Sequence, residues 1–233
     1  PQTARNTLTI PTMIRCSPAS WDCGAGRLRR RSLISPLTGF PSASPRRKEI
    51  LEQAGFSFEI LAANADENIQ EADPAEMVKK LSARKALASM EAWKQQDKSE
   101  DDILVLGADT VVVLDGQILG KPSDQADATQ MLRRLQGNTH QVYTGVTLLW
   151  MDEEKQQKQI CFAEKTDVVF YPMTETEIQA YVATNEGADK AGSYAVQGLA
   201  MKYIEKIDGD YHNVVGLPAA SIYQTLRRNH LEL

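Results

Sequence analysis

The stretch "DILVLGADTVVVLDGQILGKP", residues 102–122, carries the strongest fold signal in this chain. Its two apolar, partly β-branched runs, Ile103 to Leu106 and Val111 to Leu114, are typical of strands buried on both faces. The dipeptide Asp115-Gly116 that follows them is a hairpin signal. A strand buried on both faces needs cover on each side, so the stretch predicts a sheet packed between other layers.

Helical and strand patterns alternate on both sides of this stretch. Helix starts are expected at Ser44, at Asp73, at Ser123 or Asp124, at Thr174 and at Pro218. Strands are expected within residues 56–67, 140–150 and 159–171. The alternation predicts one α/β domain over residues 41–233, with a bilobed shape as one option.

Composition limits the function classes. The 233 residues are 42% hydrophobic and 24% charged, as in ordinary globular proteins. A net charge of −5 argues against broad electrostatic binding to nucleic acid. Because no long apolar segment is present, no membrane span is expected. Cys16, Cys23 and Cys161 match no zinc spacing and no disulfide framework, so a reducing, cytoplasmic setting is expected.

The first forty residues differ from the rest of the chain. They hold six arginines against one acid, Asp22, and many Ser, Thr and Pro residues. This basic segment, residues 1–40, is expected to be disordered: an organelle transit peptide, a flexible tail or a misassigned start. Organellar targeting by it is one option. Pro36, Gly39 and Pro41 further predict that the first strand of the domain is short and distorted, unless the start is not the native one.

Two adjacent arginines stand at the mouth of the first helix, in "SASPRRKEIL". Arg46 and Arg47 lie beside the positive end of a helix dipole, which repels cations. A bound anion would remove the conflict, because helix-terminal amides, hydroxyls and guanidinium groups all donate to phosphate. The alternative is a solvated surface pair.

Two carboxylates follow predicted strands. Asp109 comes after Gly107-Ala108, so we expect it at a strand end, where ligand crevices often form in α/β sheets. A turn aspartate that binds its own backbone is the alternative. Glu67 follows an earlier strand and is a candidate of the same kind, with an ordinary loop carboxylate as its alternative.

Other polar residues complete the list of candidates. Lys121, between Gly120 and Pro122, is either a phosphate contact or a solvated turn residue. Lys85 lies in the middle of a helix, where a snorkelling side chain is the alternative. Gln197 is either a reader of a polar ring edge or a buried structural amide. Since no Walker spacing and no catalytic nucleophile stands out, cations and hard carboxylates favour a magnesium-bound polyphosphate.

Eight short sequence blocks, which occur in a fixed order, resemble those of a known protein family. "SASPRRKEIL", "DE" at 66–67, "ARKA", "GADTVV", "GKP", "HQVYTGV", "AGSYAVQG" and "GDYHNVVGLP" occur in the order seen in the Maf family. Maf proteins are nucleoside triphosphate pyrophosphatases, related in fold to the inosine triphosphate pyrophosphatases. The resemblance covers residues 42–228 and implies a mixed, twisted sheet flanked by helices, with a central cleft.

The resemblance also implies roles for individual residues. Asp109 matches the proton acceptor of the family, and Glu67 would help to hold a divalent metal, Mg²⁺ or Mn²⁺, together with Asp109. Residues implied to bind the triphosphate are Ser42, Ser44, Arg46, Arg47, Lys85 and Lys121. Arg46, Thr110 and Gln197 match the signature of the subgroup that cleaves dTTP and UTP.

The function implied is hydrolysis of dTTP, UTP or modified pyrimidine nucleotides to the monophosphate and pyrophosphate. The only partner expected is this nucleotide, although a homodimer is compatible with the sequence. A nucleotide-binding regulator of cell division or growth, without significant turnover, is the alternative. Such a regulator would need the arginines and Lys121 but not two carboxylates, so Glu67 and Asp109 favour the enzyme.

Overall fold

The computed structural model of the chain describes residues 12–14, 37–40, 44–61, 64–69, 71–96 and 103–231. The described strands are β1 (Thr12–Ile14), β2 (Leu37–Phe40), β3 (Phe58–Ile60), β4 (Leu104–Leu114), β5 (Gln117–Leu119), β6 (Thr139–Met151), β7 (Gln157–Phe170) and β8 (Ile204–Asp208). The described helices are α1 (Pro45–Gln53), α2 (Pro74–Lys94), α3 (Gln125–Leu135), α4 (Glu175–Ala183), α5 (Tyr211–Val215) and α6 (Ala219–Arg228). Two 3₁₀ helices, η1 (Ala191–Ser193) and η2 (Leu199–Tyr203), lie between α4 and β8.

The described strands form one mixed sheet in the order β1-β3-β2-β4-β6-β7-β8, and β5 pairs with the C-terminal end of β4. β2 runs parallel to β3 and β4, whereas every other described pairing is antiparallel. The predicted α/β class and mixed sheet are therefore confirmed. β2 is four residues long and its register with β3 shifts after Thr38, as expected for a short, distorted first strand.

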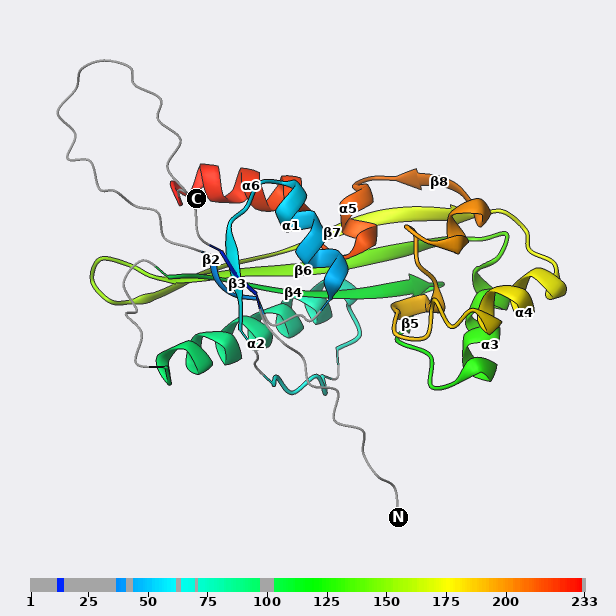
Figure 1. The fold of residues 1–233 in the computed structure, drawn as a ribbon, viewed down its shortest axis with the longest axis horizontal. Helices are drawn as coiled ribbons and strands as arrows, with labels where there is room; N and C mark the ends of the chain where they lie inside the picture. Colours follow the sequence, from blue (N-terminus) through cyan, green and yellow to red (C-terminus); the bar gives the residue numbers. More distant parts are fainter. Residues whose placement is uncertain are drawn as a thin grey trace, which may run out of the picture.

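Three long strands, β4, β6 and β7, run through the whole molecule (Figure 1). α2 covers one face of the sheet, and α1, α5 and α6 lie on the other, while α3, α4 and η1 gather at one end (Figure 1). Side chains of β4 contribute to a hydrophobic core on each face of the sheet. Leu104 and Leu106 belong to the main core. Val105, on the opposite face, belongs to a second core with Met90 and Trp93 of α2. The prediction of a strand buried on both faces is confirmed.

Two glycines let α2 lie directly on the sheet. A Cβ added to Gly107 of β4 would overlap the carbonyl oxygen of Ser82, and one added to Gly145 of β6 would overlap that of Val78. A larger side chain at either position would push the helix away. These glycines therefore set the distance between α2, which carries Lys85, and the strand that carries Asp109.

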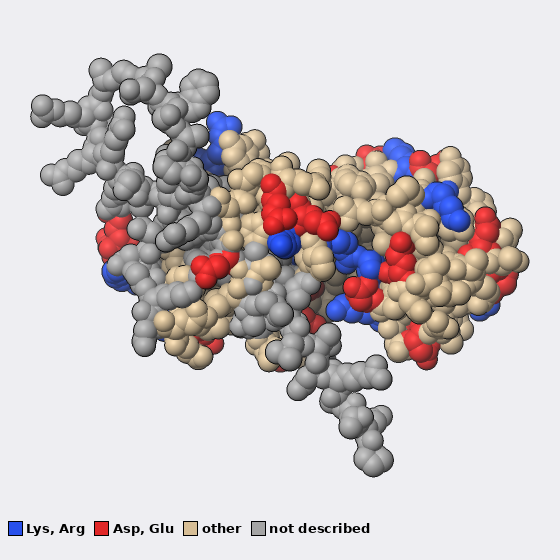
Figure 2. Space-filling view, viewed as in Figure 1, with Lys and Arg blue, Asp and Glu red and all other residues tan. Residues whose placement is uncertain are grey.

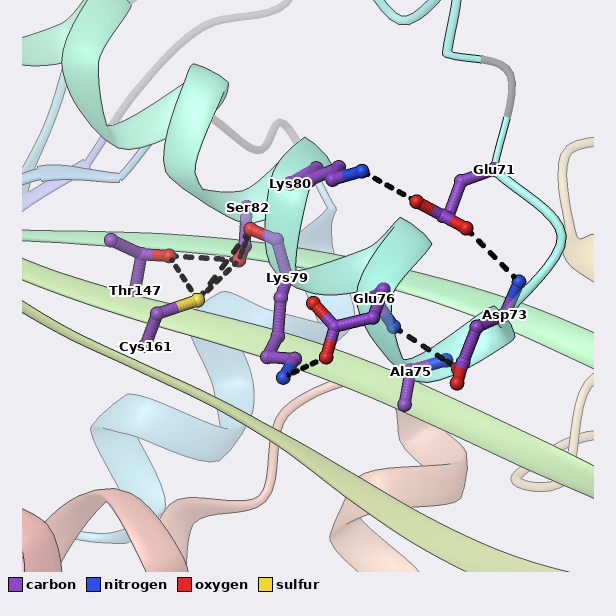
Figure 3. Close-up of polar contacts among 9 residues, drawn as sticks. All are labelled: Glu71, Asp73, Ala75, Glu76, Lys79, Lys80, Ser82, Thr147 and Cys161. Carbon is purple, nitrogen blue, oxygen red and sulfur yellow. Dashed lines mark hydrogen bonds and ion pairs between the residues drawn. The ribbon is translucent and has the colours of Figure 1, made fainter.

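Polar contacts along α2 fix its rotation and its start (Figure 3). Ser82 Oγ and Thr147 Oγ1 share a hydrogen bond of 2.9 Å, and Thr147 Oγ1 also donates to Cys161 Sγ at 3.2 Å (Figure 3). At the N-terminus, Asp73 Oδ1 accepts from Ala75 N at 2.8 Å and from Glu76 N, which confirms Asp73 as the predicted N-cap. α2 is thus pinned to β6 and β7 at the turn before Lys85.

Several other local predictions are confirmed. Asp115 and Gly116 both have positive φ and close the β4–β5 hairpin. Thr174 and Glu177 form a full capping box at the start of α4.

No helix in the described ranges is both long and apolar enough to cross a bilayer. Ser42, Cys16 and Cys23 lie outside the described residues, and the boundary between residues 1–40 and the domain stays a prediction.

Candidate active site

Asp109 and Thr110 lie side by side in the middle of β4, which continues from Leu104 to Leu114 without interruption. The prediction that Asp109 stands at a strand end is therefore wrong. The Gly107-Ala108 dipeptide that suggested a break serves the close approach of α2. The Asp109 side chain is 15% exposed, so it opens to one side of the sheet while its backbone stays paired with β6.

Lys85 connects the two candidate carboxylates. Its Nζ donates to Asp109 Oδ1 at 2.5 Å and lies 2.7 Å from Glu67 Oε1. The Lys85 side chain is only 12% exposed, whereas that of Glu67 is 65% exposed. The snorkelling alternative for Lys85 does not apply, because its ammonium points into the site. Three predicted residues from a loop, a helix and a strand thus form one charged cluster.

The charges of this cluster shift the pKa of Glu67. Partial burial opposes ionisation, but the hydrogen bond from Lys85 and then the charges of Lys85, Lys121 and Arg47 lower the pKa of Glu67 below its usual value. Glu67 is therefore an anion at neutral pH. The influence of Lys121 and Arg47 also shows that both cations are close to the cluster formed by Glu67, Lys85 and Asp109.

The side chain of Arg47 points into the protein. Its Nε donates to Gly216 O at 2.6 Å, and its two terminal nitrogens donate to Ala108 O at 3.0 Å and to Thr110 Oγ1 at 2.8 Å. Burial, the largest cause, lowers the pKa of Arg47 to about 10, while the charge of Asp109 opposes this. The solvated-pair alternative fails for Arg47, which is 8% exposed and ties α1 to both neighbours of Asp109 along β4.

Arg46 has a different environment. It is half-buried, and burial lowers its pKa while the charges of Asp189 and Glu49 oppose that shift. Asp189, in the segment that follows α4, is thus near enough to Arg46 to act on it through charge. The first turn of α1 holds no acidic residue, so the helix itself does not neutralise its cationic N-terminus. An anion bound there would offset the repulsion between the dipole and Arg46.

Thr110 belongs to a buried polar junction that the sequence did not reveal. Its Oγ1 shares a hydrogen bond of 2.9 Å with Thr144 Oγ1 of β6, and Thr144 in turn donates to Asn213 O at 3.1 Å. Thr144 and Asn213 stand inside the quoted motifs "HQVYTGV" and "GDYHNVVGLP". The signal that could have found Thr144 is its register position directly opposite Thr110.

The remaining candidates are Ser44, Lys121 and Gln197. Ser44 is the N-cap residue of α1, although its hydroxyl does not cap a backbone amide of that helix. Lys121 is exposed in the turn after β5, and its charge reaches Glu67. Gln197 is exposed, so the buried-amide alternative is wrong. Lys/Arg and Asp/Glu side chains gather around a hollow near the middle of the face shown in Figure 2, beside the position of α1 in Figure 1.

The carboxylates have the chemistry that a hard divalent cation requires. Mg²⁺ is typically held by one or two carboxylates together with substrate phosphates and water, and Glu67 and Asp109 converge on one ammonium group. Among the described residues, no group of three or more His, Cys, Asp or Glu side chains could hold a metal by itself. The donor set therefore fits a cation that the phosphates of a ligand help to bind, and not a cage made by the protein alone.

A family profile described as "Maf-like protein" matches residues 40–229. The chain belongs to the Maf family. The match includes every residue of the Glu67–Lys85–Asp109 cluster, both arginines and Gln197. The resemblance drawn from the eight sequence blocks is thereby confirmed.

Curated members of the Maf family are similar to the chain over most of its length. A dTTP/UTP pyrophosphatase of Agathobacter rectalis is 49% identical over 193 residues, which is 80% of this chain and 94% of that protein. A dTTP/UTP pyrophosphatase of Bacillus thuringiensis subsp. konkukian is 44% identical over 193 residues, 82% of this chain and 95% of that protein. Another from Bacillus anthracis is also 44% identical, with the same coverage.

Proposed function

We propose that this Maf protein hydrolyses dTTP and UTP to the nucleoside monophosphate and pyrophosphate. The observation that carries the proposal is the cluster in which Lys85 joins Glu67 and Asp109, close to two arginines at a helix N-terminus. The similar proteins named dTTP/UTP pyrophosphatase support the same reaction. Polyphosphate hydrolysis needs a base for water and cations for the phosphates, and this site offers both.

Asp109 is the proposed general base. It would accept a proton from the water that attacks the α-phosphorus, while the bond to the β-phosphate oxygen breaks and pyrophosphate leaves. Lys85 holds the carboxylate in place through the 2.5 Å hydrogen bond. The same ammonium offsets the negative charge that gathers when a polyphosphate approaches two carboxylates.

Arg46, Ser44 and Lys121 are the proposed contacts of the triphosphate, and Ser42 is assigned the same role although it lies outside the described residues. Arg47 is assigned a supporting part, because its donors reach Gly216, Ala108 and Thr110. A divalent cation, Mg²⁺ or Mn²⁺, held by Glu67 and Asp109 would neutralise charge on the phosphate oxygens. The cytoplasm is the proposed location, and the homodimer and targeting options stay open to test.

Gln197 is the proposed reader of the base. Uracil and thymine present an O4 acceptor beside an N3–H donor, and one amide group complements both. Cytosine reverses this pattern, which leaves buried polar groups unpaired. We therefore expect Gln197→Glu to lower kcat/KM for dTTP and UTP more than for CTP and GTP, by about 1–3 kcal/mol in transition-state energy. A uniform loss for all four nucleotides would assign Gln197 to the fold instead.

The experiment that tests the function is a panel of triphosphates scored by release of pyrophosphate. The panel holds dTTP, UTP, CTP, GTP and modified pyrimidine nucleotides, each with Mg²⁺ or Mn²⁺. We expect turnover of dTTP and UTP, with products limited to the monophosphate and pyrophosphate. Tight nucleotide binding without metal and without turnover would reject the enzyme in favour of a nucleotide-binding regulator.

A further inference from the structure

The loop that carries Gln197 is a tight turn that follows three buried residues. Tyr194, Ala195 and Val196 are buried, Gln197 is exposed, and the amide of Gly198 donates back to Ala195 O at 3.1 Å. The turn therefore lifts the Gln197 side chain out of the core. Its direction depends on how the two ends of the turn are held.

Two side chains hold these ends. The amide of Ala195 donates to Tyr181 Oη at 3.1 Å, and the amide of Leu199 donates to Glu186 Oε1 at 3.0 Å. Tyr181 Oη in turn donates to Glu186 Oε2 at 2.9 Å. One continuous hydrogen-bonded chain thus runs from the start of the turn, through the phenol and the carboxylate, to its end.

Tyr181 and the turn fit together closely. Tyr181 is 4% exposed, and burial followed by the neighbouring Glu186 raises the pKa of its phenol, so that it stays a donor at neutral pH. A Cβ added to Gly198 would overlap the carboxylate of Glu186. The backbone of the turn therefore lies directly against this carboxylate, and a larger residue at position 198 would push the Glu186 side chain away from it.

One member of this pair, Tyr181, lies in the wall of a cavity next to Lys121. Tyr181 and Gly187 line a cavity of about 170 Å³ together with Pro122 and Ser123, which directly follow Lys121. The charge of Arg46 also acts on Tyr181. A change in the Tyr181–Glu186 pair would therefore loosen the turn that carries Gln197.

We propose that Tyr181 and Glu186 are positioning residues that set the base selectivity of the enzyme by fixing the turn that presents Gln197. The inference rests on the proposed pyrophosphatase function. When the turn is held in place, the Gln197 side-chain amide offers one pattern of donor and acceptor. When the turn is loose, the amide can flip, so that it binds either uracil or cytosine. The pair therefore acts on the choice between bases more than on the chemical step.

The test compares kcat/KM for UTP and CTP in the parent, in Tyr181→Phe and in Gly198→Ala. Tyr181→Phe removes one hydroxyl group, and Gly198→Ala pushes the Glu186 carboxylate away from the amide of Leu199 and from Tyr181 Oη. We expect the UTP-to-CTP ratio to fall about 5- to 10-fold in each, as the loss of about one hydrogen bond predicts. Tyr223→Phe, an exposed tyrosine on α6, is the matched control and should leave the ratio unchanged.

A second comparison separates positioning from general damage. If the pair acts through Gln197, then Tyr181→Phe added to Gln197→Ala should lower the ratio no further. An unchanged ratio in Tyr181→Phe and Gly198→Ala, with an active parent, would overturn the inference and leave the proposed function intact. A parent that releases no pyrophosphate from any nucleotide would overturn both.

Discussion

Arg47→Lys separates a structural role of this arginine from direct binding of phosphate. The substitution keeps the positive charge but removes the planar group that reaches Gly216, Ala108 and Thr110. One ammonium on an unbranched chain is expected to keep one of these contacts and to lose two. Because each lost bond from a charged donor costs about 1.5 kcal/mol or more, the free energy of unfolding should fall by about 3 kcal/mol.

For a chain of this size, about 3 kcal/mol corresponds to a fall in Tm of about 6–12 °C. The assay is thermal unfolding followed by circular dichroism, with urea unfolding as the second measurement. Arg46→Lys is the matched control, since Arg46 is half-buried and interacts through charge with Asp189 and Glu49. Its unfolding free energy should change by less than about 1 kcal/mol, while its turnover of UTP falls.

The reasoning is refuted if Arg47→Lys unfolds at the same temperature as the parent. It is also refuted if the two lysine variants lose equal stability, because the buried hydrogen bonds of Arg47 would then have no special weight. Addition of a nonhydrolysed triphosphate distinguishes the roles further. A ligand that contacts Arg46 should stabilise the Arg47→Lys variant as much as it stabilises the parent.

Three further outcomes follow from the packing and the charges. Gly145→Ala should displace α2 and lower both stability and activity, while Gly120→Ala, with open space around it, should leave stability unchanged in thermal unfolding. Burial lowers the pKa of His140 from 6.5 to about 4, so the unfolded chain binds the extra proton between these values. The unfolding free energy should therefore fall by up to about 3 kcal/mol as pH drops through this window, and His140→Asn should flatten that dependence in urea titrations. Lys85→Met should raise the pKa of Glu67, a change that ¹³C NMR of the carboxyl group would detect; an unchanged value would exclude Lys85 as its cause.

Local signals explain why much of the fold could be predicted from the sequence. The cap at Asp73, the hairpin at Asp115 and Gly116, and the capping box of Thr174 and Glu177 each act within a few residues. Such features depend on residues that are close together in the sequence, and they need no tertiary contact. The helix starts and this hairpin are predictable from the sequence for this reason.

The geometry of the site could not be derived in the same way. The sequence predicts Asp109 at a strand end because Gly107-Ala108 is typical of a break, whereas Gly107 gives room to the backbone of α2. Arg47 finds its partners mainly in the backbone carbonyls of Gly216 and Ala108, and no side-chain pattern marks a carbonyl. The family resemblance implies roles for Glu67, Lys85 and Asp109, but only the packing of α2 shows Lys85 between the two carboxylates.

Release of pyrophosphate from UTP and dTTP by Asp109→Asn tests the central claim most directly. Removal of a general base typically costs about 10² to 10⁴ in rate, and the asparagine keeps the size of the side chain. Asp115→Asn is the control, because Asp115 is exposed in a turn at positive φ, which asparagine tolerates. We expect a loss of this size in Asp109→Asn alone; equal rates in Asp109→Asn and the parent would contradict the assignment of Asp109 as the general base.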